Sequence, residues 1–239
     1  MGNFDGVHLG HQSVIDLARA HGPLGIVTFA PHPREYFNPD APAFRLMSAE
    51  TRANRLAKLG VQHLYELPFD ATMASLTPEA FAQQILAQGL GVSHVVVGAD
   101  FCFGKGRAGR AADLQALGLK YGFGVTVADL VKSGAREVSS TAIRQALAEG
   151  RPRDAQAMLG HWHRIDGEVI HGEKRGRELG YPTANMSANG LHLPKLGVYA
   201  SRVDILTGPQ AGSYLGASSI GVRPMFGENT PNLETYIFD

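Results

Sequence analysis

Short apolar runs alternate with helix-like patterns along the first 150 residues. Four apolar runs bounded by glycine, proline or polar residues predict buried strands, at residues 25–29, 61–67, 94–98 and 124–130. Apolar positions at helical spacing predict helices, at residues 13–20, 49–59, 77–86, 111–121 and 142–149. Short buried strands that alternate with helices are typical of a parallel sheet covered on both faces. The first part of the chain is therefore expected to have an α/β fold.

The pattern changes after Gly150. A last predicted helix, residues 155–159, ends at Gly160, and glycine and proline become frequent from residue 163 onward. Strand-like pieces follow with no convincing helix between them, at residues 166–171, 198–206, 214–220 and 234–238. This pattern is typical of antiparallel β-structure, such as a barrel. We therefore expect two domains, residues 1–159 and 160–239.

Composition and charge argue against a nucleic-acid-binding, membrane or secreted protein. The 239 residues include 22 lysines and arginines and 22 aspartates and glutamates, so the formal net charge is zero. A neutral chain lacks the basic surface that nucleic acids and anionic membranes attract. No apolar run approaches the roughly 18 residues that span a bilayer, and the start of the chain lacks the features of a signal peptide. The single cysteine, Cys102, excludes an internal disulfide and fits a reducing compartment. We expect a cytoplasmic monomer or weak homo-oligomer whose partners are small molecules.

A glycine-rich segment with two histidines opens the chain, since residues 2–11 read GNFDGVHLGH. It runs into a predicted helix, whose free N–H groups and positive dipole end favour phosphate. His8 and His11 lie on one face there and can donate hydrogen bonds to phosphate oxygens as charge builds in a transition state. Gly10 leaves room for a nucleotide to approach the backbone. Taken alone, such a segment is more often a turn with two surface histidines.

A second candidate phosphate site lies far downstream, where residues 138–144 read VSSTAIR. The hydroxyl groups there can cap the predicted helix at residues 142–149, and with the backbone N–H groups they can form a phosphate cradle. Arg144 projects from the first turn of that helix as a charged clamp. Alone, the segment would be interpreted as a plain capping sequence. Its combination with the first segment favours a nucleotide site.

Together, the HLGH and SSTAIR segments resemble the signature of the HxGH nucleotidyltransferases, which have a Rossmann-like fold. Three further segments are similar to the adenylyltransferase module of the bacterial bifunctional riboflavin kinase/FMN adenylyltransferases, at residues 2–8, 28–33 and 97–104. The second half resembles the riboflavin kinase signature of the same family, at residues 167–172, 175–185, 197–200, 221–224 and 234–236. The resemblance spans essentially the whole chain. It implies a Rossmann-like domain followed by an antiparallel β-barrel domain.

In the first module, the resemblance implies that the phosphate of FMN attacks the α-phosphorus of ATP, forming FAD and releasing pyrophosphate. It assigns His8 and His11 to the ATP phosphates. On the opposite side, the triphosphate would be held by Ser140, Thr141 and Arg144. The positions that match ATP contacts in the family are Asn3, Phe4, Gly10 and Asp100, although the family more often has asparagine at the position of Asp100. Candidates to line the isoalloxazine pocket are Phe37 and Phe103, with core packing as the alternative.

In the second module, Thr183 and Asn185 resemble the family's magnesium and ATP ligands. Hydroxyl and amide oxygens suit a hard cation that phosphates already hold. Three residues fall in the loop expected to wrap ATP, namely Gly172, Lys174 and Gly176. Lys174 alone would be interpreted as a solvated charge. The resemblance implies Mg²⁺ as cofactor, with ATP, riboflavin and FMN as substrates.

The two ends of the chain depart from the family pattern. The family has a β-strand directly before residues 2–5, and its kinase domain continues past residue 239 with further strands and a glutamate that serves as base. We therefore expect a piece of a longer protein, with an incomplete barrel and no riboflavin kinase activity from residues 1–239 alone. Two alternatives stay open. One is a nucleotide- or flavin-binding module without turnover, and the other is an HxGH nucleotidyltransferase for another phosphate acceptor.

Overall fold

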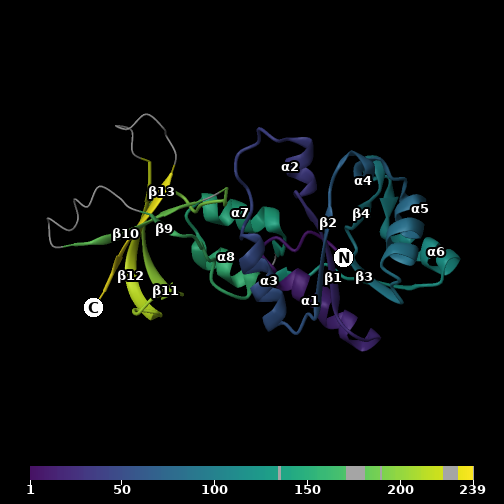
Figure 1. The fold of residues 1–239 in the computed structure, drawn as a ribbon, viewed down its shortest axis with the longest axis horizontal. Coiled ribbons are helices and arrows are strands. Elements are labelled where there is room, and N and C mark those ends of the chain that lie inside the picture. Colours follow the sequence, from purple (N-terminus) through teal and green to yellow (C-terminus); the bar gives the residue numbers. More distant parts are fainter. Residues whose placement is uncertain (134–135, 171–180, 189, 223–230, 239) are drawn as a thin grey trace.

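The computed structural model describes residues 1–133, 136–170, 181–188, 190–222 and 231–238. Helices and parallel strands form one end of the molecule, and an antiparallel sheet forms the other (Figure 1). Helices α7 (Ser140–Ala148) and α8 (Pro152–Leu159) lie between the two ends. This order of an α/β part and an antiparallel β part confirms the predicted fold class.

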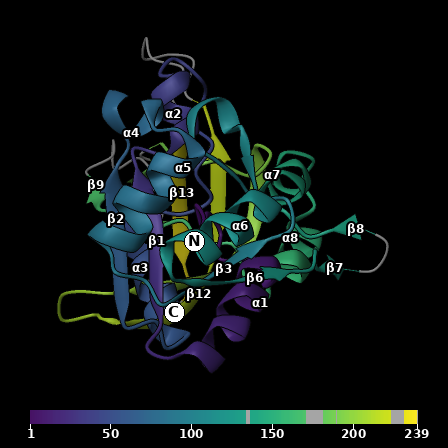
Figure 2. The same cartoon turned by 90° about the vertical axis from the view of Figure 1, so that its right-hand side faces the viewer.

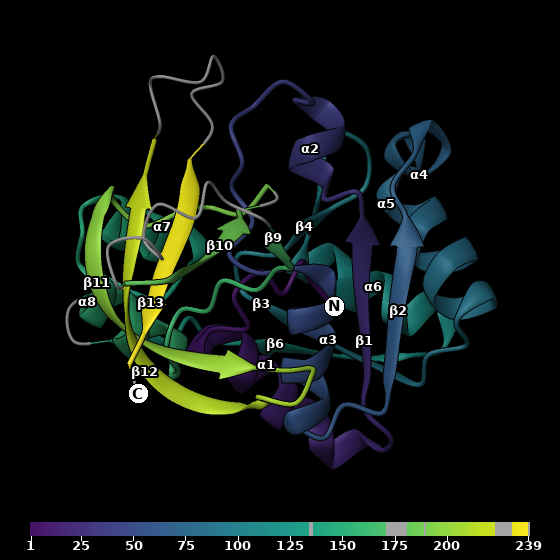
Figure 3. The same cartoon turned by 60° about the vertical axis from the view of Figure 1, so that its left-hand side comes forward.

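The four parallel strands lie close to the apolar runs that predict them, as β1 (Gly25–Ala30), β2 (His63–Pro68), β3 (His94–Gly98) and β6 (Gly124–Ala128). β1 pairs with β2, and β3 pairs with β6, both in parallel. Figure 3 shows β1 and β2 side by side and pointing the same way. Parallel neighbours require a long crossover, and helices supply it between β1 and β2 and between β3 and β6.

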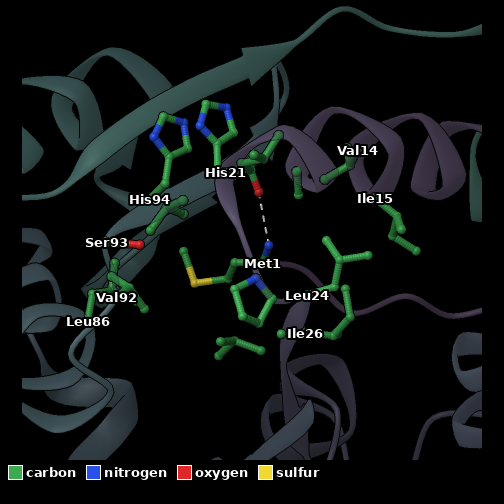
Figure 4. Close-up of a pocket in the computed structure, with 16 residues that line it drawn as sticks. Met1, Val14, Ile15, His21, Leu24, Ile26, Leu86, Val92, Ser93 and His94 are labelled. Carbon is green, nitrogen blue, oxygen red and sulfur yellow. Dashed lines mark hydrogen bonds between the residues drawn. The ribbon is translucent and has the colours of Figure 1, made fainter. Parts of the chain in front are cut away.

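The two parallel pairs form separate sheets, and the first residues of the chain lie between them. The amino group of Met1 donates a hydrogen bond to the Val96 carbonyl of β3 (3.0 Å), and the Gly2 N–H donates to the Val27 carbonyl of β1 (3.1 Å). Beside Met1, a cavity of about 100 Å³ lies between β1 and β3 (Figure 4).

Helices flank these strands, as α1 (Leu9–Ala18), α2 (Pro33–Phe37), α3 (Ala49–Lys58), α4 (Ala71–Ser75), α5 (Pro78–Ala80) and α6 (Ala111–Tyr121). Side-chain oxygens of Ser48, Asp70 and Thr77 accept N–H groups at the starts of α3, α4 and α5. α5 continues as a π-helical stretch, Phe81–Gly89. Short 3₁₀ turns occupy Arg19–His21 and Lys105–Arg107. α2 and α4 have five residues each, too few for a helical period to show in the sequence.

Three apolar clusters form the core of this part. The first packs the π-helical stretch and α6 against β3, and includes Phe81, Leu86, Val97 and Leu114. The second packs α7 against α8, and includes Leu46, Ile143, Leu147 and Leu159. The third lies under α1, and includes Phe4, Ile15 and Leu56. The start of α1 and the start of α7 therefore both lie on apolar clusters of the core.

The second part is one antiparallel sheet with the strand order β11-β12-β13-β10-β9. Its strands are β9 (Val169–Ile170), β10 (Thr183–Ser187), β11 (Gly197–Ile205), β12 (Gly212–Gly221) and β13 (Asn232–Ile237). Within the described residues the sheet has two edges, so they form no closed barrel. Two short hairpins occur in the first part, β4 (Cys102–Phe103) with β5 (Gly109–Arg110), and β7 (Lys132–Ser133) with β8 (Arg136–Glu137). The second hairpin projects from the body of the molecule (Figure 2).

Candidate functional site

The loop before α1 is buried and has an unusual backbone. Phe4 and Val7 have positive φ angles, 50° and 41°, in a region that bulky side chains rarely adopt. Their side chains are 1% and 0% exposed, so both are held in the core. The Thr28 hydroxyl donates to the Asn3 carbonyl (3.3 Å) and ties the loop to β1. Such backbone strain concentrates at functional sites. Because its side chain is buried, Phe4 can meet a nucleotide only through its backbone.

His8 and His11 face each other at the start of α1. Their rings stack with centroids 3.6 Å apart. His8 Nδ1 accepts the His11 N–H (3.3 Å), which caps the helix and leaves the His8 proton on Nε2. Burial lowers the pKa of His8 to about 4, and the nearby Arg144 cation adds to this effect. Burial, together with the neighbouring His8, lowers the pKa of His11 well below its usual value. Both imidazoles are therefore neutral near physiological pH, and each supplies one N–H donor.

Two details of this histidine pair suit a bound ligand. His11 Nδ1 is buried and has no hydrogen-bond partner among the described residues. An unmet buried polar atom costs about 1–3 kcal/mol, which a hydrogen bond from a ligand or water would offset. Gly10 permits a close approach, since a Cβ there would lie 3.1 Å from His8 Cε1 and 3.6 Å from the Val138 carbonyl oxygen. The start of α1 thus lies next to the segment that leads into α7.

The start of α7 meets the first loop directly. Ser139 Oγ accepts the Ala142 N–H (3.2 Å) and caps the helix. Ser140 Oγ donates to the Asp5 carbonyl (2.7 Å), although the two residues are 135 positions apart in the chain. Thr141 is exposed in the first turn. The structure therefore brings together the two segments that the sequence analysis assigns to phosphate.

A buried ion pair joins the same two segments. Arg144 Nη2 donates to Asp5 Oδ2 (2.5 Å), and Arg144 Nε donates to the Phe44 carbonyl (2.6 Å). Asp5 Oδ1 accepts the Leu46 N–H (2.8 Å). Burial raises the pKa of the Asp5 carboxyl, and the Arg144 guanidinium opposes that rise. Arg144 Nη1 makes no hydrogen bond within the described part of the chain.

Asp5 and Phe44 are the residues of this site that sequence reasoning missed. The position of Asp5 inside the GNFDGVH segment was a signal, because the segment is dense in candidate site residues. Phe44 gave no signal, since its role depends on a carbonyl group and on the Arg144 guanidinium carbon, which lies 5.0 Å from its ring centroid. Contacts of this kind appear only when the chain is folded.

The candidate residues Phe37, Phe103 and Asp100 differ in how far they are exposed to solvent. Phe37, at the end of α2, is 61% exposed, and its ring centroid lies 5.8 Å from that of Phe69. Phe103 is 6% exposed and packs beside Phe81 in the core, as the alternative of core packing predicts. Asp100 is exposed in the turn after β3. Only Phe37 of the two phenylalanines offers an open face on which a planar ring can stack.

A second group of oxygen donors lies on the antiparallel sheet. Thr183 and Asn185 are two residues apart on β10 and so project from one face. The register places Asn185 opposite Glu234 of β13, and Thr183 opposite Tyr236. Side chains of directly opposed residues share a face, so hydroxyl, amide and carboxylate oxygens gather there. Three residues of the expected ATP loop lie outside the described residues, namely Gly172, Lys174 and Gly176.

Comparison with known proteins matches both parts of the chain. The family model described as FAD synthetase matches residues 1–142, and that described as riboflavin kinase matches residues 159–239. The bifunctional riboflavin kinase/FMN adenylyltransferase of Pseudomonas fluorescens is 40% identical over 245 residues, covering 100% of this chain and 77% of that protein. The chain belongs to the bifunctional riboflavin kinase/FMN adenylyltransferase family. Its relative from Escherichia coli strain K12, which carries the same name, is 37% identical over 244 residues with the same coverage.

A solved structure shares the fold of this family member. The crystal structure of a Streptococcus pneumoniae protein, named a macrolide-efflux protein, has a TM-score of 0.86 and 33% sequence identity. The match covers 100% of this chain and 78% of that protein. No helix in the part that the structure describes is long and apolar enough to cross a membrane. The family assignment confirms the prediction of an adenylyltransferase module and a kinase module in one chain.

The junction between the two modules contains His163, whose ring Nε2 is buried and whose titration should make stability depend on pH. Burial and the neighbouring His192 lower the pKa of His163 to about 4. The unfolded histidine titrates near 6.5, so between these values the unfolded state binds more protons and stability falls as pH falls. From pH 6 to pH 5 we expect His163 to remove about 1 kcal/mol from the free energy of unfolding.

Urea unfolding at a series of pH values measures this effect. His163→Gln should show a shallower fall in stability than the unmodified chain over that range. His63→Gln serves as a control, because His63 is exposed on β2. Equal slopes for the His163→Gln variant and the unmodified chain would contradict the assignment of the neutral imidazole.

Proposed function

We propose that this chain makes FAD in two steps. The kinase module transfers the γ-phosphoryl group of ATP to riboflavin, and the adenylyltransferase module joins the resulting FMN to the adenylyl group of ATP. The observation that carries the proposal is the meeting of the His8/His11 loop with the start of α7, apart from a second set of oxygen donors on another sheet. The matches to both family models and to bifunctional relatives support it.

The adenylyl transfer is proposed as a single displacement. An FMN phosphate oxygen attacks the α-phosphorus of ATP, and the bond from that phosphorus to the leaving pyrophosphate breaks. No covalent enzyme intermediate is needed, so the protein contributes positioning and charge stabilisation. The neutral His8 and His11 donate N–H groups to phosphate oxygens from one side. The Thr141 hydroxyl and Arg144 Nη1 hold the triphosphate from the other side, while Ser140 fixes the start of α7 on the Asp5 carbonyl.

The rest of the nucleotide and flavin site is built around the same loop. Asn3, Phe4 and Gly10 line the ATP site, with Phe4 contributing its backbone. Asp100 lies at the end of β3, where nucleotides bind in open parallel sheets. Phe37 stacks on the isoalloxazine ring, because its aromatic face is exposed.

The kinase step is proposed to use the oxygen donors of β10 and β13. The Thr183 hydroxyl and the Asn185 amide oxygen would hold Mg²⁺ together with the ATP phosphates, since Mg²⁺ prefers oxygen ligands and is often shared with substrate phosphates. When bound, Mg²⁺ neutralises charge on the transferring phosphoryl group. In place of the glutamate that the sequence analysis expects beyond residue 239, we propose the Glu234 carboxylate, opposite Asn185, as the base of the kinase step. It accepts the proton of the riboflavin 5′-hydroxyl as that oxygen attacks the γ-phosphorus and the bond from that phosphorus to the leaving ADP breaks. The loop with Gly172, Lys174 and Gly176 is proposed to wrap ATP.

We also propose that the two modules divide near residue 160. α8 ends there at Gly160, whose φ of 73° is the left-handed conformation typical of a helix end. A Cβ at this position would lie 2.6 Å from Leu9 Cδ2, so glycine also permits close packing on α1.

Thr183→Ala tests the two-module proposal. The full chain should form FMN from riboflavin and FAD from FMN, each with magnesium-ATP and followed by chromatography. Thr183→Ala should slow FMN formation about 10- to 100-fold, as expected when a hydrogen bond or ligand to a charged group is lost. FAD formation from FMN should stay within about twofold, because Thr183 lies on the other module.

Thr207→Ala is the matched control, since Thr207 is exposed in the turn between β11 and β12. It should leave both reactions unchanged. Equal loss of both activities in a folded Thr183→Ala variant would indicate one shared site and would contradict the proposal of separate modules.

A further inference from the structure

A segment of the kinase module reaches the helix of the adenylyltransferase module that carries Arg144. The segment, residues 190–195, lies between β10 and β11. Its Leu191 is 5% exposed and forms an isolated β-bridge with Arg45. Its Lys195 N–H donates to the Leu147 carbonyl of α7 (2.9 Å). The segment is therefore docked both on the loop at residues 44–46 and on α7.

His192 is the residue of this segment that contacts both partners. Its backbone N–H donates to the Arg45 carbonyl (2.7 Å), and its ring Nε2 lies 3.0 Å from the Arg144 carbonyl oxygen. Because a carbonyl oxygen only accepts, Nε2 carries the proton in this contact. Phe44, the neighbour of Arg45, accepts a hydrogen bond from Arg144 Nε. A closed ring of contacts results, from His192 to Arg45, Phe44, Arg144 and back to His192.

This closed set of contacts determines where the Arg144 guanidinium lies. The guanidinium spans the gap between α7 and the 44–46 loop, where it is bound to the Phe44 carbonyl and to Asp5. Asp5 in turn holds the Leu46 N–H of that loop (2.8 Å). A change in the spacing between α7 and the loop would therefore pull Arg144 away from one of its two partners. His192 is the group that ties the backbones on both sides of this gap.

We propose that His192 is a positioning residue for FAD formation, although it lies in the kinase module. It fixes α7 against the 44–46 loop and so holds Arg144, the clamp on the ATP triphosphate. The inference rests on the proposed function of the first module. It also joins the two nucleotide sites by a short path, because Asn185 is only seven residues before His192 in the chain.

The test compares three substitutions of His192 in the full chain. His192→Ala removes the donor, and kcat/KM for ATP in FAD formation should fall about 5- to 10-fold, as expected for the loss of one hydrogen bond. The KM for FMN and the rate of FMN formation from riboflavin should stay within about twofold. His192→Gln places an amide donor at a similar reach and should restore activity, whereas the shorter His192→Asn should not. The control is Lys195→Ala, which keeps the backbone contact to Leu147 and should behave like the unmodified chain.

A double-mutant cycle separates positioning through Arg144 from a general loss of structure. In an Arg144→Ala background, His192→Ala should change FAD formation by less than twofold, because the residue through which it acts is already gone. The full effect of His192→Ala persisting in that background would overturn the proposal, as would an unimpaired His192→Ala variant. If His192→Ala does not fold, the Gln and Asn variants decide, and equal activities for those two would overturn it. Absence of FAD formation by the unmodified chain would instead overturn the proposed function and the inference with it.

Discussion

Replacement of His11 by alanine should slow FAD formation from FMN and ATP by about 100-fold or more, which is the usual cost of removing one preorganised donor from a transition state. The His11 ring packs against those of His8 and Phe4, so it is held in place before any ligand binds. Burial keeps its pKa low, and its neutral N–H group is available without the cost of desolvating a cation. The initial rate of FAD formation, measured by chromatography at saturating FMN and ATP, reports this loss directly.

The His11 experiment has two controls. FMN formation from riboflavin should be unchanged in His11→Ala, because that reaction is assigned to the other module. His63→Ala, at an exposed histidine of β2, should leave both reactions unchanged. If His8→Ala and His11→Ala each kept FAD formation within a factor of about two while remaining folded, the assignment of the histidine pair to the ATP phosphates would be wrong.

The elements with a strong local pattern were predictable from the sequence. The run at residues 94–98 is β3 with the same bounds, and the helical spacing at residues 111–121 is α6 with the same bounds. In both cases the side chains that create the pattern also form the core, as Val97 and Leu114 do. Local pattern and tertiary packing agree there, which is why the prediction succeeds.

β10 is a strand that the local sequence pattern did not predict. Its residues, Thr183–Ser187, were singled out for chemistry and not as a strand, because Ala184 and Met186 are the only apolar residues of this short stretch and make its alternation a weak signal. The strand exists because β13 and β9 pair with it on either side. For the same reason the sequence analysis placed residues 234–236 in the kinase signature but expected the base beyond residue 239, since only the register brings Glu234 opposite Asn185.

For the nucleotide site, the sequence indicates which segments come together. It does not indicate which side chains of those segments pack in the core and which are accessible to a ligand. Resemblance assigned Phe4 to ATP and Phe103 to flavin, yet the two side chains are 1% and 6% exposed. A motif records which residue is required at a position and does not distinguish packing from contact. Asp5 is the opposite case, because its carboxylate joins both segments through Arg144 over 139 positions of sequence. A local sequence pattern cannot reveal a contact between residues so far apart in the chain.

Glu234→Gln should reduce FMN formation from riboflavin by about 100- to 10,000-fold, the usual range for loss of a general base. Glutamine has nearly the shape of glutamate, and its amide oxygen can still accept the hydrogen bond that Asn232 Nδ2 donates to Glu234 Oε1 (2.9 Å). The strand pairing of β13 with β10 and β12 should therefore persist. What the variant lacks is a carboxylate that can take the riboflavin hydroxyl proton beside Asn185. The rate of FMN formation with magnesium-ATP measures the loss.

The informative comparison is between FMN formation and FAD formation by the same Glu234→Gln variant. FAD formation from FMN should stay within about twofold in Glu234→Gln, because the histidine pair and Arg144 belong to the other module. Glu50→Gln, at an exposed position in the first turn of α3, is the matched control and should leave both reactions intact. FMN formation within twofold of the unmodified chain would show that another group takes the proton, and it would remove Glu234 from the proposed kinase site. A drop in FMN formation with a normal pattern of unfolding would instead place the base on β13, opposite the proposed magnesium ligands.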